Sequence, residues 1–170
     1  MTKGEAILDL KHQYSVNDAL KLEDGTWAID FSLPSNGKTY RITASSPEYV
    51  ADSVNQQIRL DLRTYDAEQP YREAVEALSK MCLEHTGSGS YAAVQVLLSA
   101  YNGNNYQVDL TDLCHLDESN FQHAMAIIQG RVFCSREPHS MIENGAKIFD
   151  ALEEKWGNLN VRRRYETYYK

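Results

Sequence analysis

Apolar and polar residues alternate along the N-terminal third of the chain, and this period of two predicts β-strands with one buried face. The alternating apolar residues are Leu20, Leu22, Trp27, Ile29, Phe31, Leu33, Tyr40, Ile42 and Ala44. Asp24-Gly25, the usual dipeptide of a type I′ hairpin turn, and Pro34-Ser35-Asn36-Gly37 separate the runs. We expect a three-stranded antiparallel meander over residues 19–44, with a short helix over Glu5–His12 before it.

The segment after the meander fits two periodicities. Ser46-Pro47-Glu48 is typical of a helix start, because serine caps a helix and proline suits its first position. Apolar residues then recur every four positions from Val50 to Leu62. Residues 57–64 also alternate between apolar and charged side chains, which is a strand pattern. Periodicity therefore leaves 57–64 open between helix and strand, and we favour a helix that ends before a fourth strand.

From Pro70 onward the apolar residues are spaced as on helices. The four stripes consist of Val75, Leu78 and Cys82; Val94, Leu97, Leu98 and Tyr101; Phe121, Met125, Ile128 and Val132; and Ile142, Gly145, Phe149, Leu152 and Trp156. Helix-breaking stretches separate them at 86–90 and 102–105, and Gly157 ends the last stripe. We predict an α+β fold in which the meander packs with a C-terminal bundle of about four helices.

The absence of a repeat or low-complexity linker favours one α+β domain over residues 1–160, with the meander at 19–44, mainly helical structure at 47–156 and a basic, aromatic tail at 161–170. A chain of 170 residues is an ordinary length for one domain. The predicted core consists of Trp27, Ile29, Phe31, Tyr40, Ile42, Val75, Leu78, Val94, Leu97, Leu98, Phe121, Met125, Ile128, Phe149, Leu152 and Trp156.

Charge is distributed unevenly. The chain carries a net charge of −7, the last ten residues carry +3, and the first 160 therefore carry −10. Residues 81–130 contain no lysine or arginine. Their acidic residues are Glu84, Asp109, Asp112, Asp117 and Glu118. Such a body should repel a nucleic-acid backbone and favour a protein partner with a basic surface.

The cysteines and the N-terminal sequence predict a cytoplasmic protein. The three cysteines are an odd number without CxxC spacing, and no basic segment followed by an apolar run opens the chain. We therefore expect unpaired thiols in a reducing compartment. No stretch approaches the length of apolar sequence that a membrane span needs.

No motif in the sequence predicts a metal, a cofactor or a catalytic group. Cys114-His115 with His123, and Cys134 with His139, lack the paired close spacings of zinc ligands. Thr86-Gly87-Ser88-Gly89-Ser90 lacks the lysine of a phosphate-binding loop, so a helix–helix connector with a serine cap is the better interpretation. A cysteine nucleophile with a histidine base at His115, His123 or His139 stays open as an alternative.

Two groups of residues are candidate binding surfaces. The first is the acidic group Asp109, Asp112, Asp117 and Glu118, a candidate for protein binding. One alternative is that Thr111 or Asp109 caps a helical turn, with Leu110, Leu113 and Leu116 pointing inward at helical spacing. On this view the acidic residues only cap helices and keep the protein soluble. The second group, a candidate for nucleic-acid binding because it mixes guanidinium groups with rings, is Arg162, Arg163, Arg164, Tyr165 and Tyr168. The alternative is a solvated chain end.

Residues 75–156 also resemble a known family. The residues that carry the resemblance are Val75-Glu76-Ala77-Leu78, Thr86-Gly87, Ala93-Val94, Leu97-Leu98 with Tyr101-Asn102, Asp109-Leu110-Thr111-Asp112-Leu113 with Leu116-Asp117, Arg136-Glu137-Pro138-His139, Asn144-Gly145, Phe149, Leu152 and Trp156. The region resembles an uncharacterised family of small helical proteins carried on bacterial plasmids and integrative elements. The resemblance implies a mobile-element setting and no activity.

These observations lead to one hypothesis and two alternatives. The leading hypothesis is a non-enzymatic, protein-binding accessory protein of a mobile genetic element, of the kind that inhibits host defence (anti-restriction or anti-CRISPR). The first alternative is a nucleic-acid-binding protein that uses the basic, aromatic C-terminus. The second is an enzyme with an unrecognised Cys/His site.

Overall fold

The computed structural model of the chain describes residues 16–33 and 36–166, with side chains up to residue 163. The helix expected over Glu5–His12, the residues Pro34-Ser35 of the second turn, and Tyr168 lie outside the described residues. The chain divides into two compact units, Met1–Tyr65 and Asp66–Lys170. One helix, α2 (Pro47–Glu84), begins in the first unit and ends in the second. The expectation of a single domain over 1–160 stays a prediction.

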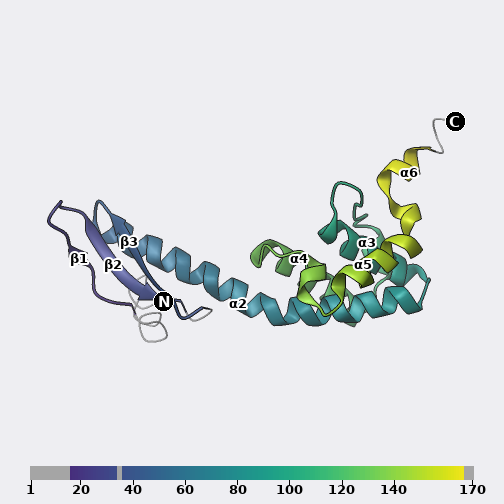
Figure 1. Cartoon of the computed structure of the whole chain (residues 1–170), viewed down its shortest axis with the longest axis horizontal. Coiled ribbons are helices and arrows are strands. Elements are labelled where there is room, and N and C mark those ends of the chain that lie inside the picture. The colour runs from purple at the N-terminus through teal and green to yellow at the C-terminus, as the bar shows by residue number, and fades with distance from the viewer. Residues whose placement is uncertain (1–15, 34–35, 167–170) are drawn as a thin grey trace. The chain divides into compact units, whose positions relative to one another are not determined.

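The first unit contains the predicted meander. Its strands are β1 (Leu20–Lys21), β2 (Trp27–Ser32) and β3 (Thr39–Ala44), paired antiparallel in the order β1-β2-β3 (Figure 1). The fold class predicted from the sequence is confirmed: a three-stranded antiparallel sheet followed by helices.

The first hairpin turn differs from the type I′ turn expected at Asp24-Gly25. Gly25 has a φ of 85°, while Asp24 is not among the residues with positive φ. A type I′ turn needs positive φ at both central residues, so that prediction is wrong. The Asp24 carboxylate instead accepts hydrogen bonds from the Thr26 amide and hydroxyl. The loop is therefore a three-residue connection that ends in a left-handed glycine.

The first part of α2 packs against the sheet within the first unit. Ser46 Oγ accepts a hydrogen bond from the Tyr49 amide, as the predicted cap requires. The cluster that fills this unit consists of Ile29, Phe31, Leu33, Val50, Val54 and Ile58. Residues 57–64 are helical throughout and the expected fourth strand is absent, because the four-residue spacing buries Ile58 and leaves Leu60 48% exposed.

The helix expected to begin at Pro70 is a continuation of α2, with Pro70 in its interior. An interior proline removes one backbone hydrogen bond and costs about 3 kcal/mol or more. The turns that follow it offset this cost, because Tyr71, Ala74, Val75 and Leu78 have no exposed surface. Proline alone indicated a helix boundary here, but the burial of these residues stabilises a helix that continues through Pro70.

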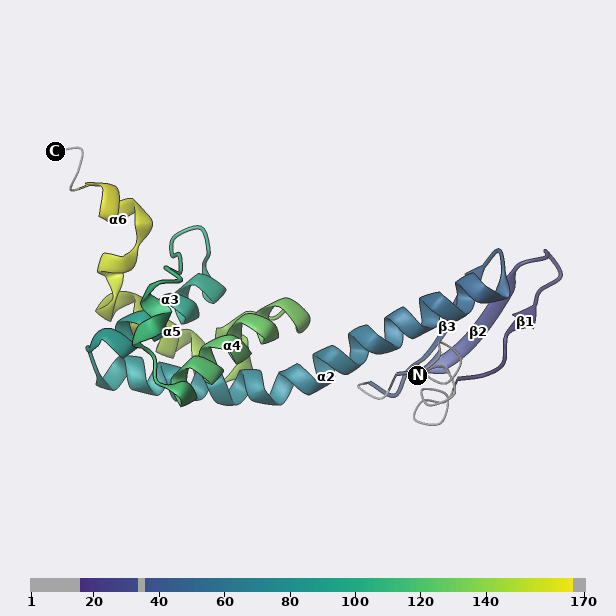
Figure 2. The ribbon, with the colours of Figure 1, turned by 180° about the vertical axis from the view of Figure 1, so that it is seen from behind.

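The second unit surrounds the C-terminal half of α2 with helices. These are α3 (Ser88–Tyr101), α4 (Glu118–Phe133) and α5 (Gly145–Lys155), followed by the short α6 (Val161–Glu166). Three 3₁₀ helices lie between them: η1 (Asp112–His115), η2 (Pro138–Met141) and η3 (Gly157–Leu159). Figures 1 and 2 show α3, α4 and α5 gathered along α2. No helix within the described ranges is long and apolar enough to cross a bilayer.

The predicted core is confirmed on α2, α3 and α5 and corrected elsewhere. Its members on those three helices are buried, as are Ile29 and Phe31 in the sheet. Tyr40 is 36% exposed. Trp27, Ile42, Phe121, Met125 and Ile128 are only half-buried. The buried residues of α4 are Ala124, Ile127 and Gly130. The face of α4 that enters the core therefore combines one large apolar residue, Ile127, with two small residues, Ala124 and Gly130, which allow a close helix approach.

Gly130 shows why the small residues matter. A Cβ atom at this position would lie 2.1 Å from Cγ of Tyr71. The Tyr71 ring has no exposed surface, so it cannot move aside into solvent. Its hydroxyl donates a hydrogen bond of 2.9 Å to the carbonyl oxygen of Arg136, beyond the end of α4. One side chain thus fixes both the position of α4 and the path of the chain after it.

Gly130→Ala should destabilise the protein by about 1–3 kcal/mol, as overpacking of a filled core does. A loss of stability would be informative, because alanine in a helix is otherwise more favourable than glycine by about 1 kcal/mol. Urea denaturation followed by circular dichroism measures the change. Gly89→Ala is the matched control, since Gly89 also lies in a helix and its Cβ would meet the nearest atom at an ordinary 3.4 Å. Equal stability of Gly130→Ala and the wild type would contradict the proposed contact.

Candidate binding groove and the predicted sites

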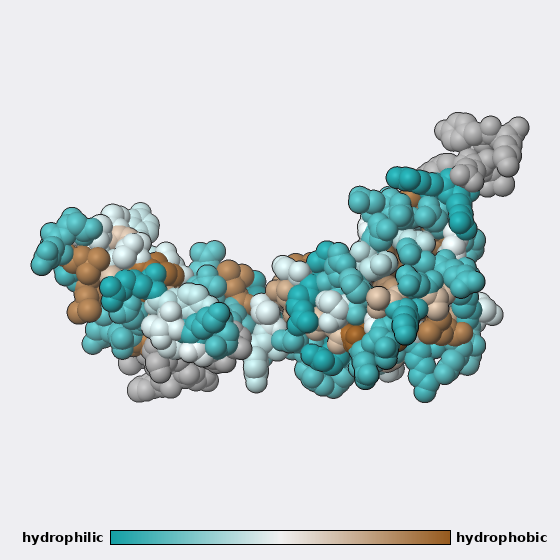
Figure 3. All heavy atoms as spheres, viewed as in Figure 1, coloured by the Kyte–Doolittle hydropathy of each residue, from teal (hydrophilic) through white to brown (hydrophobic). Residues whose placement is uncertain are grey.

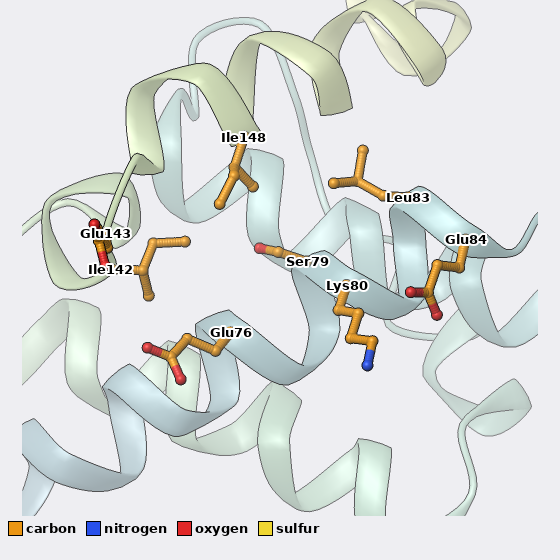
Figure 4. Close-up of a pocket in the computed structure, with 8 residues that line it drawn as sticks. All are labelled: Glu76, Ser79, Lys80, Leu83, Glu84, Ile142, Glu143 and Ile148. Atoms are coloured by element: carbon orange, nitrogen blue, oxygen red, sulfur yellow. The ribbon is translucent and has the colours of Figure 1, made fainter.

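A pocket of about 400 Å³ lies in the second unit between α2 and the start of α5 (Figure 4). Residues of α2 line one side at the spacing of one helix face, and residues before and within α5 line the other. The lining residues are Glu76, Ser79, Lys80, Leu83, Glu84, Ile142, Glu143 and Ile148. We call this pocket the α2–α5 groove. On the face in Figure 3, apolar residues of this unit form small separate groups in a mainly hydrophilic surface.

Aliphatic side chains form the walls of the α2–α5 groove. Leu83, Ile142 and Ile148 pack against the core of the unit while remaining only partly buried. Ile142, Ile148 and Leu83 surround the space in Figure 4 from three directions. Each leaves apolar surface that an occupant would remove from water, at about 25 cal/mol for each Å².

Ser79 supplies a polar atom inside these apolar walls. The residue is 2% exposed, and its Oγ has no hydrogen-bond partner in the described part of the protein. Figure 4 shows the hydroxyl directed toward Ile148 and Ile142. A buried hydroxyl without a partner costs about 1–3 kcal/mol. A bound group that donates to or accepts from this hydroxyl would recover part of that free energy.

Carboxylates dominate the rim of the groove. The charged residues that line the groove are Glu76, Glu84 and Glu143 and one cationic residue, Lys80. Among the described residues, none of the three glutamates forms an ion pair within 4 Å. The nearby Lys155 is committed elsewhere, because its ammonium donates to the carbonyl oxygens of Leu83 and His85 at the C-terminal end of α2. The rim therefore favours a cationic occupant.

The structure places the predicted acidic residues on one segment that runs from the end of α3 to the first turn of α4. Their side chains have structural partners. The Asp112 carboxylate accepts from Nε2 of the buried Gln95 at 2.6 Å. Asp109 accepts from the Thr111 amide and hydroxyl. The bond between Asp112 and Gln95 holds the segment against α3, as does the hydrogen bond from the Asp109 amide to Gln95 Oε1, whereas the bonds between Asp109 and Thr111 are local to the segment.

The other two acidic residues organise the start of α4. Asp117 is the N-cap, and its carboxylate accepts from the Asn120 amide at 2.9 Å. Glu118 accepts from the side chain of Gln122. The helix-capping alternative considered for this segment is thus correct for Asp117. The inward orientation expected for Leu110 is wrong, because this residue is 75% exposed.

The Thr86–Ser90 stretch connects α2 to α3, as expected, but without a serine cap. The N-cap residue of α3 is Gly87, and no side chain caps the helix. His85, His115 and Asp117 lie beside the connector around a shallow space of about 450 Å³. The capping prediction fails because the serines follow the N-cap residue instead of occupying it.

The Cys/His alternative gains no support from the geometry. Within the described residues, no three His, Cys, Asp or Glu side chains converge as a metal site. Burial raises the pKa of Cys82 to about 12, although the Lys155 ammonium opposes the shift. Its Sγ donates to the carbonyl oxygen of Ser90. His139 packs edge-on against Tyr101, with ring centroids 5.2 Å apart. Cys82 and His139 thus make packing contacts, and the Cys/His alternative stays a prediction.

The first residues of the basic, aromatic tail continue into α6. Arg162 and Arg163 are exposed, and Nη1 of Arg163 lies against Gly157, 2.9 Å from the position of an added Cβ. The backbone of Arg164 and Tyr165 is helical. The structure therefore leaves the nucleic-acid hypothesis for these residues as a prediction.

The α2–α5 groove was not among the predicted sites. Ser79 and Leu83 each follow a residue of the predicted core stripe, Leu78 and Cys82. The apolar periodicity therefore did not distinguish them as residues of a binding site. The only sign of the groove in the sequence is that a serine and a leucine follow residues of the apolar stripe and widen the helix face that the stripe forms. Ile142 belonged to the predicted α5 stripe, yet it precedes the helix, which begins at Gly145.

Comparison with known protein families gives a match to the part of the chain that contains the groove. The sequence model of a family of unknown function (DUF7673) matches residues 72–157, half of the chain. The chain belongs to this family. The match spans the groove, the acidic segment and α3 to α5, and it supports the resemblance to an uncharacterised family inferred over residues 75–156. A search of curated proteins and a search of solved structures found no match.

The three thiols should differ in reactivity toward iodoacetamide at pH 8. A cysteine with its pKa raised to about 12 stays protonated at this pH, and only the thiolate attacks. Exposed Cys114 should be alkylated first and buried Cys82 only after unfolding. Peptide mass mapping of the folded and urea-unfolded protein measures this order, with Cys114→Ser as the control. Alkylation of Cys82 in the folded protein would contradict the burial argument.

Proposed function

We propose that the chain is a non-enzymatic protein-binding protein that holds a segment of its partner in the α2–α5 groove. The observation that carries this proposal is the combination of aliphatic walls with a buried hydroxyl that lacks a partner. Groups of this kind occur where a bound molecule completes the packing and hydrogen bonding. A well-packed apolar anchor surrounded by a polar rim is also the usual centre of a protein interface.

The acidic segment is a second part of the proposed interface. Asp109, Asp112, Asp117 and Glu118 carry negative charge on a region that contains no lysine or arginine between residues 81 and 130. Their hydrogen bonds to neighbours hold the carboxylates in place without neutralising them. We assign them a steering role, which raises the association rate with a basic partner and weakens as salt screens the charges.

The proposed biological setting is a mobile genetic element in the bacterial cytoplasm. This setting rests on the sequence resemblance over residues 75–156 and on the acidic character of the first 160 residues. An accessory protein of such an element that inhibits host defence would meet enzymes with basic nucleic-acid grooves. An acidic surface that occupies such a groove is the mechanism we infer for an anti-restriction or anti-CRISPR role.

Ile142→Glu should abolish partner binding through the groove, because it replaces an apolar wall, against which the partner would pack, with a charged and hydrated side chain. The full chain and the variant are used to purify partners from a lysate of the source cells, and bound proteins are quantified by mass spectrometry. Val132→Glu is the matched control, since it adds the same charge at an exposed apolar residue outside both the groove and the acidic segment. Loss of a partner with Ile142→Glu but not with Val132→Glu is expected. Identical partners for both would overturn the proposal.

The combined change Asp112→Asn, Asp117→Asn and Glu118→Gln should slow association with that partner by about threefold to tenfold and reduce its salt dependence. These substitutions remove charge while keeping hydrogen-bond acceptors, and asparagine caps a helix as well as aspartate. Surface plasmon resonance at several salt concentrations measures the rate. Glu73→Gln, Asp150→Asn and Glu154→Gln remove the same charge elsewhere and serve as the control. Equal rates for both triple variants would assign the acidic segment a structural role alone.

A further inference from the structure

We infer that the α2–α5 groove recognises a tyrosine or tryptophan side chain on a partner segment that also carries a neighbouring lysine or arginine. This inference rests on the proposed function and specifies the chemistry of the partner. Three properties of the groove lead to it: its size and walls, the hydroxyl of Ser79, and the charge of its rim.

The walls and volume suit one large side chain. A pocket of about 400 Å³ bounded by Leu83, Ile142 and Ile148 can enclose an aromatic ring together with part of its backbone. Tyrosine and tryptophan bury large areas with only two rotatable side-chain bonds, so they lose little conformational entropy on binding. They are accordingly enriched among the residues that dominate protein interfaces.

The hydroxyl of Ser79 selects among aromatic residues. A purely hydrocarbon side chain, such as phenylalanine or leucine, would cover Oγ and leave it without a partner. A tyrosine hydroxyl can donate to or accept from Oγ, and a tryptophan Nε1–H can donate to it. Both residues combine an apolar body with a polar tip, which matches aliphatic walls around one buried polar atom.

The rim determines what lies beside the aromatic residue. Among the residues that line the groove, Glu76, Glu84 and Glu143 are acidic and Lys80 alone is basic. A lysine or arginine close to the anchor would meet these carboxylates, whereas an aspartate or glutamate would be repelled. Exposed ion pairs contribute modestly, so the basic residue adds specificity and rate more than affinity.

A random peptide library displayed on phage tests the inference. The library is panned against the full-length protein and depleted on the Ile142→Glu variant, so that groove-dependent peptides remain. Enriched peptides should contain tyrosine or tryptophan with a nearby lysine or arginine. The best peptide is then synthesised with its aromatic anchor and with phenylalanine in that position. Calorimetry measures both dissociation constants for the wild type, for Ser79→Ala and for the rim variant Glu84→Lys, Glu143→Lys.

On the wild type, the phenylalanine peptide should bind about threefold to tenfold more weakly, the worth of one hydrogen bond. On Ser79→Ala the two peptides should bind equally. Ser79→Ala is expected to fold, because it removes an unsatisfied hydroxyl and introduces a good helix former. The rim variant should weaken both peptides and reverse the salt dependence.

Two outcomes overturn the inference while the proposed function stands. They are enrichment of groove-dependent peptides without tyrosine or tryptophan, and a phenylalanine peptide that binds the wild type as tightly as the original. A third outcome has a different meaning. If no peptide distinguishes the wild type from Ile142→Glu, when the variant has a native circular dichroism spectrum, the groove is not a protein-binding site and both proposals fail.

Discussion

The second unit depends on the side chain of Tyr71, which lies one residue after the proline inside α2. Its ring occupies the space that a side chain at Gly130 would need, and its hydroxyl binds the Arg136 carbonyl. Burial of the ring raises the pKa of the Tyr71 hydroxyl well above its usual range, so the hydroxyl keeps the proton that it donates in this bond. The contact joins α2, α4 and the connection to α5, the frame on which the α2–α5 groove stands.

The elements that could be predicted from the sequence are those in which one periodicity excludes the other. Between Trp27 and Leu33 only a strand places every large apolar residue on one face, and the strand is found there. Between Val50 and Leu62 the sequence fits both the helix and the strand periodicity. Predicting the helix would have required knowing which of these residues pack against the sheet. Proline at position 70 indicated a helix boundary, and this expectation is wrong, because the buried residues after Pro70 outweigh the lost hydrogen bond and α2 continues through it.

Helix α4 and the groove show a different limit. Hydropathy favoured Phe121, Met125 and Ile128 as the buried face, whereas the close approach of helices requires small residues, and Ala124 and Gly130 supplied them. Ser79 is invisible for a related reason. A serine on a helix is ordinary in sequence, and it becomes informative only when the structure shows that nothing in the described protein satisfies its hydroxyl. The acidic residues could be identified from their charge. Their hydrogen bonds to Gln95 could not be predicted, because Gln95 is distant from them in the sequence.

The far wall of the groove is set by backbone conformation as much as by side chains. Asn144 has a φ of 54°, and Gly145 starts α5 so close to the His139 carbonyl that an added Cβ would lie 1.9 Å from its oxygen. These two residues end the connection after η2 abruptly, which leaves Ile142 and Glu143 outside the helix and beside α2. Gly145 permits this close approach because any larger residue would meet the His139 carbonyl. The partly buried Ile142 and the buried hydroxyl of Ser79 then line one groove, and the unsatisfied hydroxyl costs stability unless a ligand bonds to it.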